Sequence, residues 1–488
     1  MKKDKKNKND KIRKFSIIKM IIAVIFFLVG LILFVSILNL DLIPTKYLAI
    51  VGIVLIVIEA IVDLCLLSKK RWLNGISIAL FIIFTLIFIV GIKYVNETDA
   101  FLDSSLNNAE EILDIDFYLL GNEEYTEEEI TSGEVYYYNS TLFIDKALAE
   151  LNKKYSVNVT ELDDITTLFD CDMFLIDKTS YYLFIEELGY SADDYYLLYE
   201  FSIEYADEEA NESEEATESE ESKDNTSSNN DDYYNIYLGG YDFSGYRMDL
   251  NKLITINTST NEILITNIHR FTYINIPAYN QKNTLSSTAR YGVQNNVEAL
   301  EELFGIDIDY YVSVDSTGLV SLVDAIGGIE YCSDQAFTTT HATVLGTYDD
   351  TNGEHVKIIK GCQHLNGIET LTVARERYAF KLGAVQRDEN TTAIMLDILY
   401  QMRNPSNITR YSSILNAVSG LYTTTIPRSV LTDGVKKLLN GGWSIDTQTL
   451  SGTNGTNKVH FSNLSGAVNY PNSSSVTKCS NGIKSLAN

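Results

Sequence analysis

The chain has 488 residues, a formal net charge of −28 and 45% hydrophobic residues. An acidic balance of this size speaks against a nucleic-acid-binding protein, which needs a basic surface. Five cysteines are too few for a disulfide-built scaffold, and neither they nor the five histidines have the CxxC or HxxxH spacing of a zinc site. The chain also lacks a GxSxG elbow and a P-loop, so neither a serine hydrolase nor a nucleotide-driven enzyme is supported.

The first hundred residues predict a membrane anchor. Residues 1–14 carry eight Lys and Arg side chains, and three apolar runs follow at residues 16–38, 48–67 and 73–95. Each run is close to the roughly 20 residues that a helix needs to cross a bilayer. A cleaved signal peptide is the alternative for the first run, but two further apolar runs follow it. We therefore predict three transmembrane helices within residues 1–98.

The positive charges predict how these helices are oriented. The loop between the second and third runs contains Lys69, Lys70 and Arg71, whereas the only basic residue between the first and second runs is Lys46. Because Lys and Arg accumulate on the cytoplasmic side, we expect the N-terminus inside and the chain after Lys93 outside. The predicted location is the cell membrane, with a multi-pass anchor and extracellular C-terminal domains.

The next part of the chain is expected to hold a small domain and a linker. Residues 99–205 are long enough for one core, and we expect an α+β accessory domain. Its predicted strands are 135–138, 181–185 and 196–203, and its predicted helix is 147–155. Ten acidic residues crowd positions 207–224, where no apolar side chain is larger than alanine. Residues 206–232 are therefore predicted to be a disordered acidic linker.

Residues 233–488 are long enough for a full domain in which strands and helices alternate. Such an alternation predicts an α/β layered domain. The predicted strands are 235–238, 250–257, 262–268 and 310–315. The predicted helices are 292–304, 317–326, 368–375 and 391–402, and Gly327 and Gly328 are expected to end the second of them.

Three arginines near the end of this pattern indicate an anion-binding site. Arg375, Arg377 and Arg387 fall within thirteen residues. On an extended segment, the spacing of the first two would place both side chains on one face. Two guanidinium groups on one face suit a ligand with several anionic oxygens, such as a pyrophosphate. The alternative is a solvated basic turn.

A second polar cluster indicates a site for a hard metal ion. Asp242, Arg247, Asp249 and Asn251 lie close together in the sequence, and Arg270 follows the next predicted strand. Strand alternation would place Asp249 and Asn251 on one face. Carboxylates beside a substrate phosphate are what Mg²⁺ prefers. Taken singly, each of these residues is more simply a surface side chain, but with the three arginines they form a plausible anion and metal site.

Residues 233 to about 485 resemble the LytR–CpsA–Psr family of Gram-positive cell-envelope proteins. The matching stretches, in order, are NIYLGGYD, RMDLNKLITIN, ILITNIHRFTYINIP, YGVQNNVEALEELFGIDIDYYVSVDSTGLVSLVDAIGGIE, GCQHLNGIETLTVARERYAF and GAVQRDEN. The order of membrane spans, accessory domain and large domain also matches. The resemblance implies an α/β layered sandwich, with a mixed sheet flanked by helices, a small α+β accessory domain and three preceding transmembrane helices.

The resemblance also implies a function and residue roles. Family members are phosphotransferases that move a glycopolymer, such as a teichoic acid or a capsule, from an undecaprenyl-pyrophosphate carrier in the membrane to peptidoglycan. The implied catalytic residues are Asp249, Arg270 and Arg377. The implied pyrophosphate-binding residues are Arg247, Arg270, Arg375, Arg377, Arg387 and Gln386. The implied ligands of Mg²⁺ are Asp242 and Asp249. The apolar faces of the sheet and its helices are expected to enclose the polyprenyl tail.

Several departures from the family pattern leave two other readings open. Phe271 and Ala384 stand where the family usually has acids, and Thr391 stands where a glutamine is common. The family lysine expected near residues 284–287 is absent, and the nearest lysine is Lys282. The chain could therefore be a catalytically weakened relative that binds polyprenyl pyrophosphate as an envelope scaffold or regulator. The third reading is a membrane-anchored surface or adhesion protein without an anion site.

Cys332 and Cys362 are a possible disulfide pair. They flank a short insertion, residues 333–361, that would form a strand pair closed at its base. Two buried free thiols are the alternative, and the spacing alone does not decide between them.

Overall fold

The computed structural model describes residues 2–68, 70–105, 113–138, 141, 143–188, 190–191, 194–205, 232–242, 247–277, 280–288, 292–343, 355–381, 383–402, 410–460 and 462–487. Contacts between residues divide the chain into two compact units. The first unit contains residues 1–107, 400–419 and 426–442, and the second contains residues 108–399, 420–425 and 443–488.

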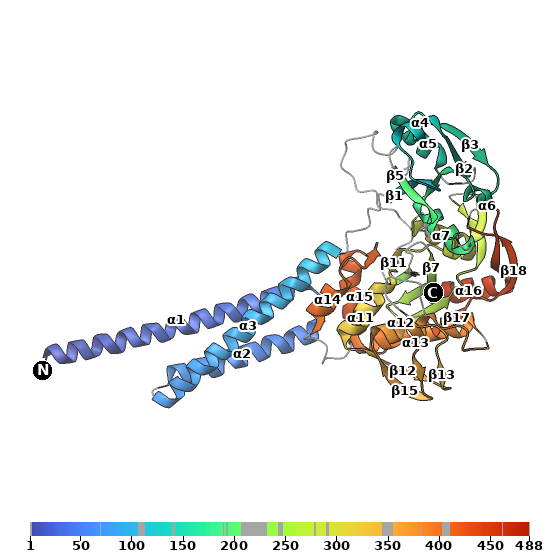
Figure 1. Ribbon diagram of the computed structural model, residues 1–488. Coiled ribbons are helices and arrows are strands. Elements are labelled where there is room, and N and C mark those ends of the chain that lie inside the picture. The colour runs from blue at the N-terminus through green and yellow to red at the C-terminus, as the bar shows by residue number, and fades with distance from the viewer. Residues whose placement is uncertain are drawn as a thin grey trace, which may run out of the picture. The chain divides into compact units, whose positions relative to one another are not determined.

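The first unit is built on three long apolar helices, α1 (Lys2–Leu40), α2 (Thr45–Leu67) and α3 (Arg71–Ser105). Figure 1 shows them side by side in blue. Within the described residues, three stretches are long and apolar enough to cross a membrane, at Ile17–Leu40, Thr45–Leu67 and Trp72–Asp103. Phe26, Val62 and Phe88, one from each helix, are buried where the helices pack together. The three predicted apolar helices are confirmed.

Two helices from late in the sequence, α14 (Tyr411–Val418) and α15 (Arg428–Asn440), belong to the same unit. Arg428 forms ion pairs with Asp99 and Asp103 at the end of α3. Lys436 of α15 also forms an ion pair, with its Nζ 2.6 Å from Oδ2 of Asp41, which lies in the loop between α1 and α2. This loop and the C-terminal end of α3 therefore lie at the same end of the helix bundle.

The second unit contains two sheets, and the first is formed by residues 113–205. Its strands are ordered β3-β2-β4-β1-β5. The strands are β1 (Leu113–Gly121), β2 (Glu134–Tyr138), β3 (Asn158–Leu162), β4 (Met173–Asp177) and β5 (Tyr196–Tyr205). The helices are α4 (Glu127–Ser132), α5 (Ile144–Lys154), α6 (Ile165–Leu168) and α7 (Lys178–Leu188). An α+β arrangement is thus present, with the predicted strands in β2 and β5 and the predicted helix in α5.

The strand predicted at residues 181–185 is wrong, because these residues lie in α7. The Asp177 carboxylate accepts the backbone N–H of Ser180 at 2.8 Å and so satisfies a donor at the helix start. Tyr181, Phe184 and Ile185 are buried together, and their spacing is that of a helix face. The short aromatic run has high strand propensity, but its apolar residues follow the helical period.

The second sheet is mixed and runs in the order β16-β11-β6-β7-β8-β17. Its central strands β6 (Tyr233–Tyr241), β7 (Met248–Asn257) and β8 (Glu262–Asn267) are antiparallel to one another. Strand β11 (Tyr310–Val314) runs parallel to β6, and β17 (Ser444–Thr449) runs parallel to β8. The edge strand β16 (Tyr422–Thr424) is antiparallel to β11. The four strands predicted from the sequence are β6, β7, β8 and β11.

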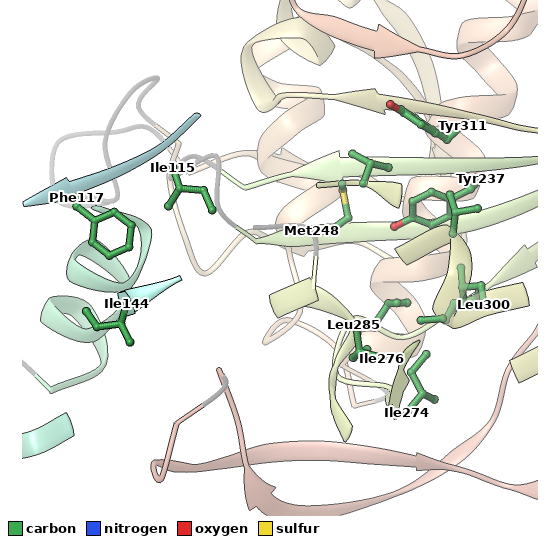
Figure 2. Packing of buried hydrophobic residues seen from close by; sticks show 14 of the residues in the cluster. Ile115, Phe117, Ile144, Tyr237, Met248, Ile274, Ile276, Leu285, Leu300 and Tyr311 are labelled. Atoms are coloured by element: carbon green, nitrogen blue, oxygen red, sulfur yellow. The ribbon is translucent and has the colours of Figure 1, made fainter. Parts of the chain in front are cut away.

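Helices flank this sheet. Alternation buries Asn235, Tyr237 and Gly239 of β6. Figure 2 shows Tyr237 and Met248 of the sheet near Leu285 and Leu300. The helices that contact the sheet or one another include α9 (Leu285–Thr288), α10 (Gln294–Phe304), α11 (Ser316–Ile326), α12 (Gly367–Arg375), α13 (Ala384–Met402) and α16 (Ser473–Leu486). The predicted mixed sheet flanked by helices is confirmed, as are its four predicted helices.

The insertion between Cys332 and Cys362 contributes to two short antiparallel strand pairs. The described strands are β12 (Ile329–Ser333), β13 (Phe337–Thr338), β14 (Lys357–Ile358) and β15 (Gly361–Leu365). Strand β12 pairs with β15, and β13 pairs with β14. Cys332 lies opposite Cys362, and the two form a disulfide. The predicted bridge at the base of a strand pair is confirmed.

Short strands complete the second unit. Strand β9 (Tyr273–Ile276) pairs with β10 (Gln281–Thr284), and β18 (Gly452–Lys458) pairs with β19 (Ser465–Pro471). The domain boundaries at residues 98, 205 and 232 stay predictions, and the acidic linker falls on residues 206–231, outside the described part of the chain.

Candidate functional site

Asp249 lies where the pairing between β6 and β7 is interrupted. Gly240 pairs with Leu250 and Tyr241 pairs with Met248, so Asp249 falls between two pairs. A bulge of this kind re-aims a side chain and is common beside functional sites. The Asp249 carboxylate forms an ion pair with Arg270, which follows β8.

Arg387 reaches the same aspartate from the first turn of α13. Gly383, with a φ of +48° that favours glycine, accepts the N–H of Arg387 at 3.1 Å. Arg387 is buried, its Nη1 lies 4.0 Å from Asp249 Oδ2, and its Nη2 donates to the Asp249 carbonyl at 3.3 Å. Arg387 therefore contacts both the side chain and the backbone of Asp249.

Arg377 completes the cluster from the loop after α12. This helix begins at a capping box formed by Asn366 and Glu369, and it ends at Arg375. Burial, together with the positive charges of Arg270 and Arg387, lowers the pKa of Arg377. The three guanidinium groups are therefore close enough to repel one another.

The charges of this cluster do not balance. Burial alone would raise the pKa of Asp249, but Arg270 and Arg387 outweigh it and lower the pKa to about 2. The carboxylate is therefore ionised at neutral pH and compensates one of the three positive charges of Arg270, Arg377 and Arg387. Asp388 lies 3.6 Å from Arg387, and burial raises the pKa of its carboxyl group. A ligand with several anionic oxygens would supply the missing negative charge.

Arg270 also offers a hydrogen-bond donor to such a ligand. Its Nε is buried and has no hydrogen-bond partner among the described residues. A buried donor without a partner costs about 1–3 kcal/mol, which an anionic oxygen at this position would recover. The Arg270 guanidinium lies over the ring of Phe271, 4.5 Å from its centroid. The position at which the family usually has an acid thus presents an aromatic face to the arginine.

The predicted metal ligand Asp242 lies beside the cluster. Arg247 Nε donates to Asp242 Oδ2 at 2.9 Å, and the backbone N–H of Asp242 donates to the Arg247 carbonyl at 2.8 Å. Arg247 also helps to lower the pKa of Asp249. Arg247 thus pairs with one of the two carboxylates that were predicted to hold Mg²⁺, and its charge acts on the other.

Two predicted anion-binding residues have other partners. Arg375 donates to Thr343 of the insertion at 3.4 Å, whereas Arg377 donates to the hydroxyl of Tyr378 at 3.4 Å and lies near enough to Arg270 and Arg387 for their charges to lower its pKa. Because Arg375 ends a helix instead of lying on a strand, these contacts do not show the common face predicted for it and Arg377. Gln386 donates to the side chains of Glu389 and Asn390, at 3.0 and 3.3 Å.

Asn251 was predicted to share a strand face with Asp249, but the two side chains have different partners. It accepts the hydroxyl of Tyr237 at 2.6 Å and donates to the Met248 carbonyl at 3.0 Å. Asp249 instead contacts Arg270 and Arg387. The register shift breaks the alternation on which the predicted common face depended.

The sequence reasoning missed His269. Burial and the charges of Arg387 and Arg270 lower the pKa of His269 to about 4, so the ring is neutral at physiological pH. Its Nδ1 accepts the backbone N–H of Phe271 at 3.2 Å. The signal in the sequence was its position directly before Arg270, at the end of a strand.

Lys252 was also missed, although a lysine inside an apolar strand is unusual. It is 1% exposed, and its Nζ donates to Asn267 Oδ1 at 2.5 Å, Thr392 Oγ1 at 2.9 Å and the Asp388 carbonyl at 3.3 Å. These bonds tie β7 to α13 one turn beyond Arg387. Burial lowers the pKa of Lys252 to about 8.

Several solved structures are similar to this chain. B. subtilis TagU has a TM-score of 0.41 and 22% identity, over 53% of this chain and 97% of that one. A structure described as TagT bound to LI-WTA has a TM-score of 0.42 and 18% identity, over 52% of this chain and 90% of that one.

Curated relatives carry the name polyisoprenyl-teichoic acid–peptidoglycan teichoic acid transferase TagU. The Bacillus mycoides (strain KBAB4) protein is 26% identical over 195 residues, 40% of this chain and 60% of the relative. The Enterococcus faecalis (strain ATCC 700802 / V583) protein is 28% identical over 174 residues, 36% of this chain and 53% of the relative. The chain thus spans between half and two thirds of the length of these relatives.

A family model covers more of the chain than these pairwise matches do. It is described as the LytR_cpsA_psr family, and it matches residues 200–477, more than half of the chain. All the arginines and aspartates of the cluster fall inside this range. The chain belongs to the LytR_cpsA_psr family.

Proposed function

We propose that the protein transfers a glycopolymer, such as a teichoic acid or a capsule, from an undecaprenyl-pyrophosphate carrier to peptidoglycan. The observation that carries this proposal is the cluster of Arg270, Arg377 and Arg387 around the carboxylate of Asp249. Family membership supports it, and so does the printed name of the curated relatives, which are teichoic acid transferases.

The arginines would act by positioning and charge neutralisation. An acceptor hydroxyl of peptidoglycan attacks the phosphorus that carries the glycopolymer. The bridging P–O bond breaks as the new P–O bond forms, and the lipid monophosphate leaves. Arg270 and Arg377 would neutralise the charge that develops on the leaving phosphate. This chemistry needs no covalent nucleophile from the protein.

The residues present fit a magnesium ion that is shared with the substrate. Among the described residues, no group of three or more His, Cys, Asp and Glu side chains could hold a metal ion. Mg²⁺, however, is commonly held by one or two carboxylates and by phosphate oxygens of a substrate. Asp242 and Asp249 would be these carboxylates; Arg247 pairs with Asp242, and its charge helps to lower the pKa of Asp249. A bound Mg²⁺ supplies further neutralisation of the pyrophosphate.

The proposed setting is the outer face of the cell membrane. The Lys and Arg asymmetry supports an N-terminus inside and the large domain outside. The ion pairs of α15 add that Asp41 and Asp99 lie at the same end of the helix bundle, so the α1–α2 loop and the end of α3 would lie on the same side of the membrane.

A second candidate is a weakened relative that binds the lipid pyrophosphate without turning it over. Phe271 favours this candidate, because its ring lies under the Arg270 guanidinium where the family usually has an acid. Losing a group that assists proton transfer costs about 10²–10⁴-fold in rate. On this alternative, Ala384→Asp would raise turnover by restoring the other missing acid.

One assay separates the two candidates. The full-length protein in detergent is given a polyprenyl-pyrophosphate-linked glycopolymer, peptidoglycan fragments and Mg²⁺, and the release of polyprenyl monophosphate is followed. Acceptor-dependent release that is lost on chelation and in Asp249→Ala supports the transferase. Saturable binding of the lipid without release supports the weakened relative, and the absence of both contradicts the two candidates together.

A further inference from the structure

Tyr378 is an exposed aromatic residue beside the arginine cluster. It follows Arg377 directly and is 66% exposed. The Arg377 guanidinium lies 5.2 Å from the centroid of the Tyr378 ring, and Arg377 in turn faces Arg270 and Arg387. A single exposed aromatic residue is ordinary on a protein surface. Tyr378 differs from an ordinary exposed aromatic residue because its backbone and its ring are both held by neighbouring side chains.

The backbone under Tyr378 is fixed by a buried carboxylate. Glu376 is 1% exposed, and its Oε1 accepts the N–H groups of Tyr378 and Ala379 at 2.7 and 2.9 Å. The backbone N–H and the hydroxyl of Thr340 donate to the same carboxylate. Burial would raise the pKa of Glu376, but these hydrogen bonds outweigh it and lower the pKa. The loop that carries Tyr378 is therefore held in one conformation.

The disulfide-closed insertion holds the ring itself. His341 packs edge-to-face against Tyr378, with ring centroids 5.3 Å apart. Phe337 of β13 packs in the same manner on Phe380, at 4.7 Å. Tyr378 is thus supported by Arg377 and by His341, and much of its ring remains open to solvent.

This arrangement has the properties of a sugar-binding surface. A sugar ring presents C–H groups on its faces, and the negative face of an aromatic ring attracts them. A tyrosine offers such a face at a low cost in conformational entropy, because only two side-chain torsions are fixed. The first sugar of a lipid-linked glycopolymer is bonded directly to the pyrophosphate. A residue that flanks the pyrophosphate-binding arginines is therefore within reach of that sugar.

We propose that Tyr378, supported by Arg377 and by His341 of the insertion, forms the subsite for the sugar that is bonded to the carrier pyrophosphate. This inference rests on the proposed function, because it requires the arginines to hold the pyrophosphate. It adds recognition of the sugar to recognition of the pyrophosphate. The residues that would recognise the sugar are Tyr378, next to the arginine cluster, and His341 of the insertion. Lipid contact is the competing role for an exposed tyrosine near a membrane.

The test compares two lipids on the full-length protein in detergent. One is polyprenyl pyrophosphate without a sugar, and the other is the same lipid with one N-acetylglucosamine. We expect the parent protein to bind the sugar-bearing lipid more tightly. Tyr378→Ala should weaken binding of that lipid about five- to tenfold and change binding of the sugar-free lipid less than about twofold. Tyr378→Phe keeps the ring and removes only the hydroxyl that accepts a long hydrogen bond of 3.4 Å from Arg377, so it should keep the preference for the sugar-bearing lipid.

Control variants separate this inference from the proposed function. Tyr196→Ala removes another exposed tyrosine, 46% exposed in β5, and should change neither affinity. If Tyr378→Ala weakens both lipids equally, Tyr378 contacts the lipid and the sugar subsite is wrong. If it changes neither, or if the parent does not prefer the sugar-bearing lipid, the subsite is also wrong. If Arg377→Ala leaves both affinities unchanged, the proposed function fails instead.

Discussion

The environment of Arg270 supports the proposed binding of an anion. Its guanidinium is paired with Asp249, stacked on Phe271 and close to two further arginines, yet its buried Nε has no hydrogen-bond partner among the described residues. Guanidinium groups cannot lose their protons at physiological pH. Binding a polyanion, as proposed above, would neutralise the positive charge that remains in this cluster.

His269 gives the cluster a pH-dependent stability. In an unfolded chain its pKa is near 6.5, whereas burial and the arginines lower the pKa to about 4 in the fold. Between these values the unfolded state binds a proton that the folded state does not, so stability falls as the pH falls from about 6.5 to 4. We expect a loss of roughly 2–3 kcal/mol between pH 6.5 and 4.5.

Thermal unfolding of the full-length protein in detergent checks this expectation. His269→Gln removes the titrating group and should flatten the stability curve over the same range. The groups that face His269 are Arg270, Arg377, Arg387 and Asp249, and none of them changes its charge there. A histidine variant with the same slope as the parent would show that the ring is not held neutral.

The sequence identified some of the residues that the fold brings together, but it did not identify all of them. The basic residues indicated an anion site, and Arg270, Arg377 and Arg387 do converge. Arg375 lies at the end of a predicted helix, but its contact with Thr343 of the insertion is a tertiary contact that the sequence does not show. His269 and Lys252 belong to no motif that the sequence analysis recognised. Their contacts and shifted pKa values result from burial, which a single sequence does not show.

At the scale of elements, Lys252 connects the central strand β7 to α13. Lys252→Met keeps the length of the side chain and removes its three hydrogen bonds to Asn267, Thr392 and Asp388. We expect a loss of about 1.5–3 kcal/mol of stability, the range for a hydrogen bond to a charged group. Thermal unfolding measures it, with the exposed Lys381→Met as the matched control. If Lys252→Met and Lys381→Met are equally stable, the hydrogen bonds of Lys252 do not stabilise the fold.

The disulfide stabilises the insertion that supports the arginine loop. Cys332 and Cys362 are separated by 30 residues, and closing a loop of this length contributes roughly 3–4 kcal/mol in the chain-entropy model. We expect mass spectrometry of the protein, alkylated without reductant, to leave both cysteines unmodified. Alkylation at both positions would rule the bridge out.

Element prediction succeeded where the apolar period was long. Strands β6, β7 and β8 and helices α10 and α11 follow from clear periods and from glycines that end the helices, such as Gly327 with a φ of +94°. It failed at residues 181–185, where five residues are too few to separate a helix from a strand. The bulge at Asp249 was also missed, since a bulge is set by the partner strand.

At the scale of the whole molecule, the three N-terminal apolar helices also pack against helices from late in the sequence. Helices α14 and α15 pack with the membrane helices in one unit, and Leu431 lies against Leu40 and Leu102. Helix α15 thus depends on the apolar helices for part of its packing. For this reason the experiments above use the full-length protein.

The topology can be tested in cells. If the N-terminus is inside, protease added to intact, wall-stripped cells should digest the chain after Asn96, since charge asymmetry places that region outside. The N-terminal segment should remain protected until the membrane is permeabilised, which serves as the internal control. Protection of the region after Asn96 in intact cells would contradict the topology and the envelope role.

The affinity of the arginine cluster for polyprenyl pyrophosphate tests the central claim most directly. The measurement compares the parent protein, Arg377→Ala and the control Lys381→Ala, which removes an exposed charge from the same loop. We predict that Arg377→Ala weakens binding by about 1.5–3 kcal/mol, the range for a hydrogen bond to a charged group, while Lys381→Ala binds as the parent does. If Arg377→Ala binds as tightly as the parent, the cluster is structural and the site is wrong.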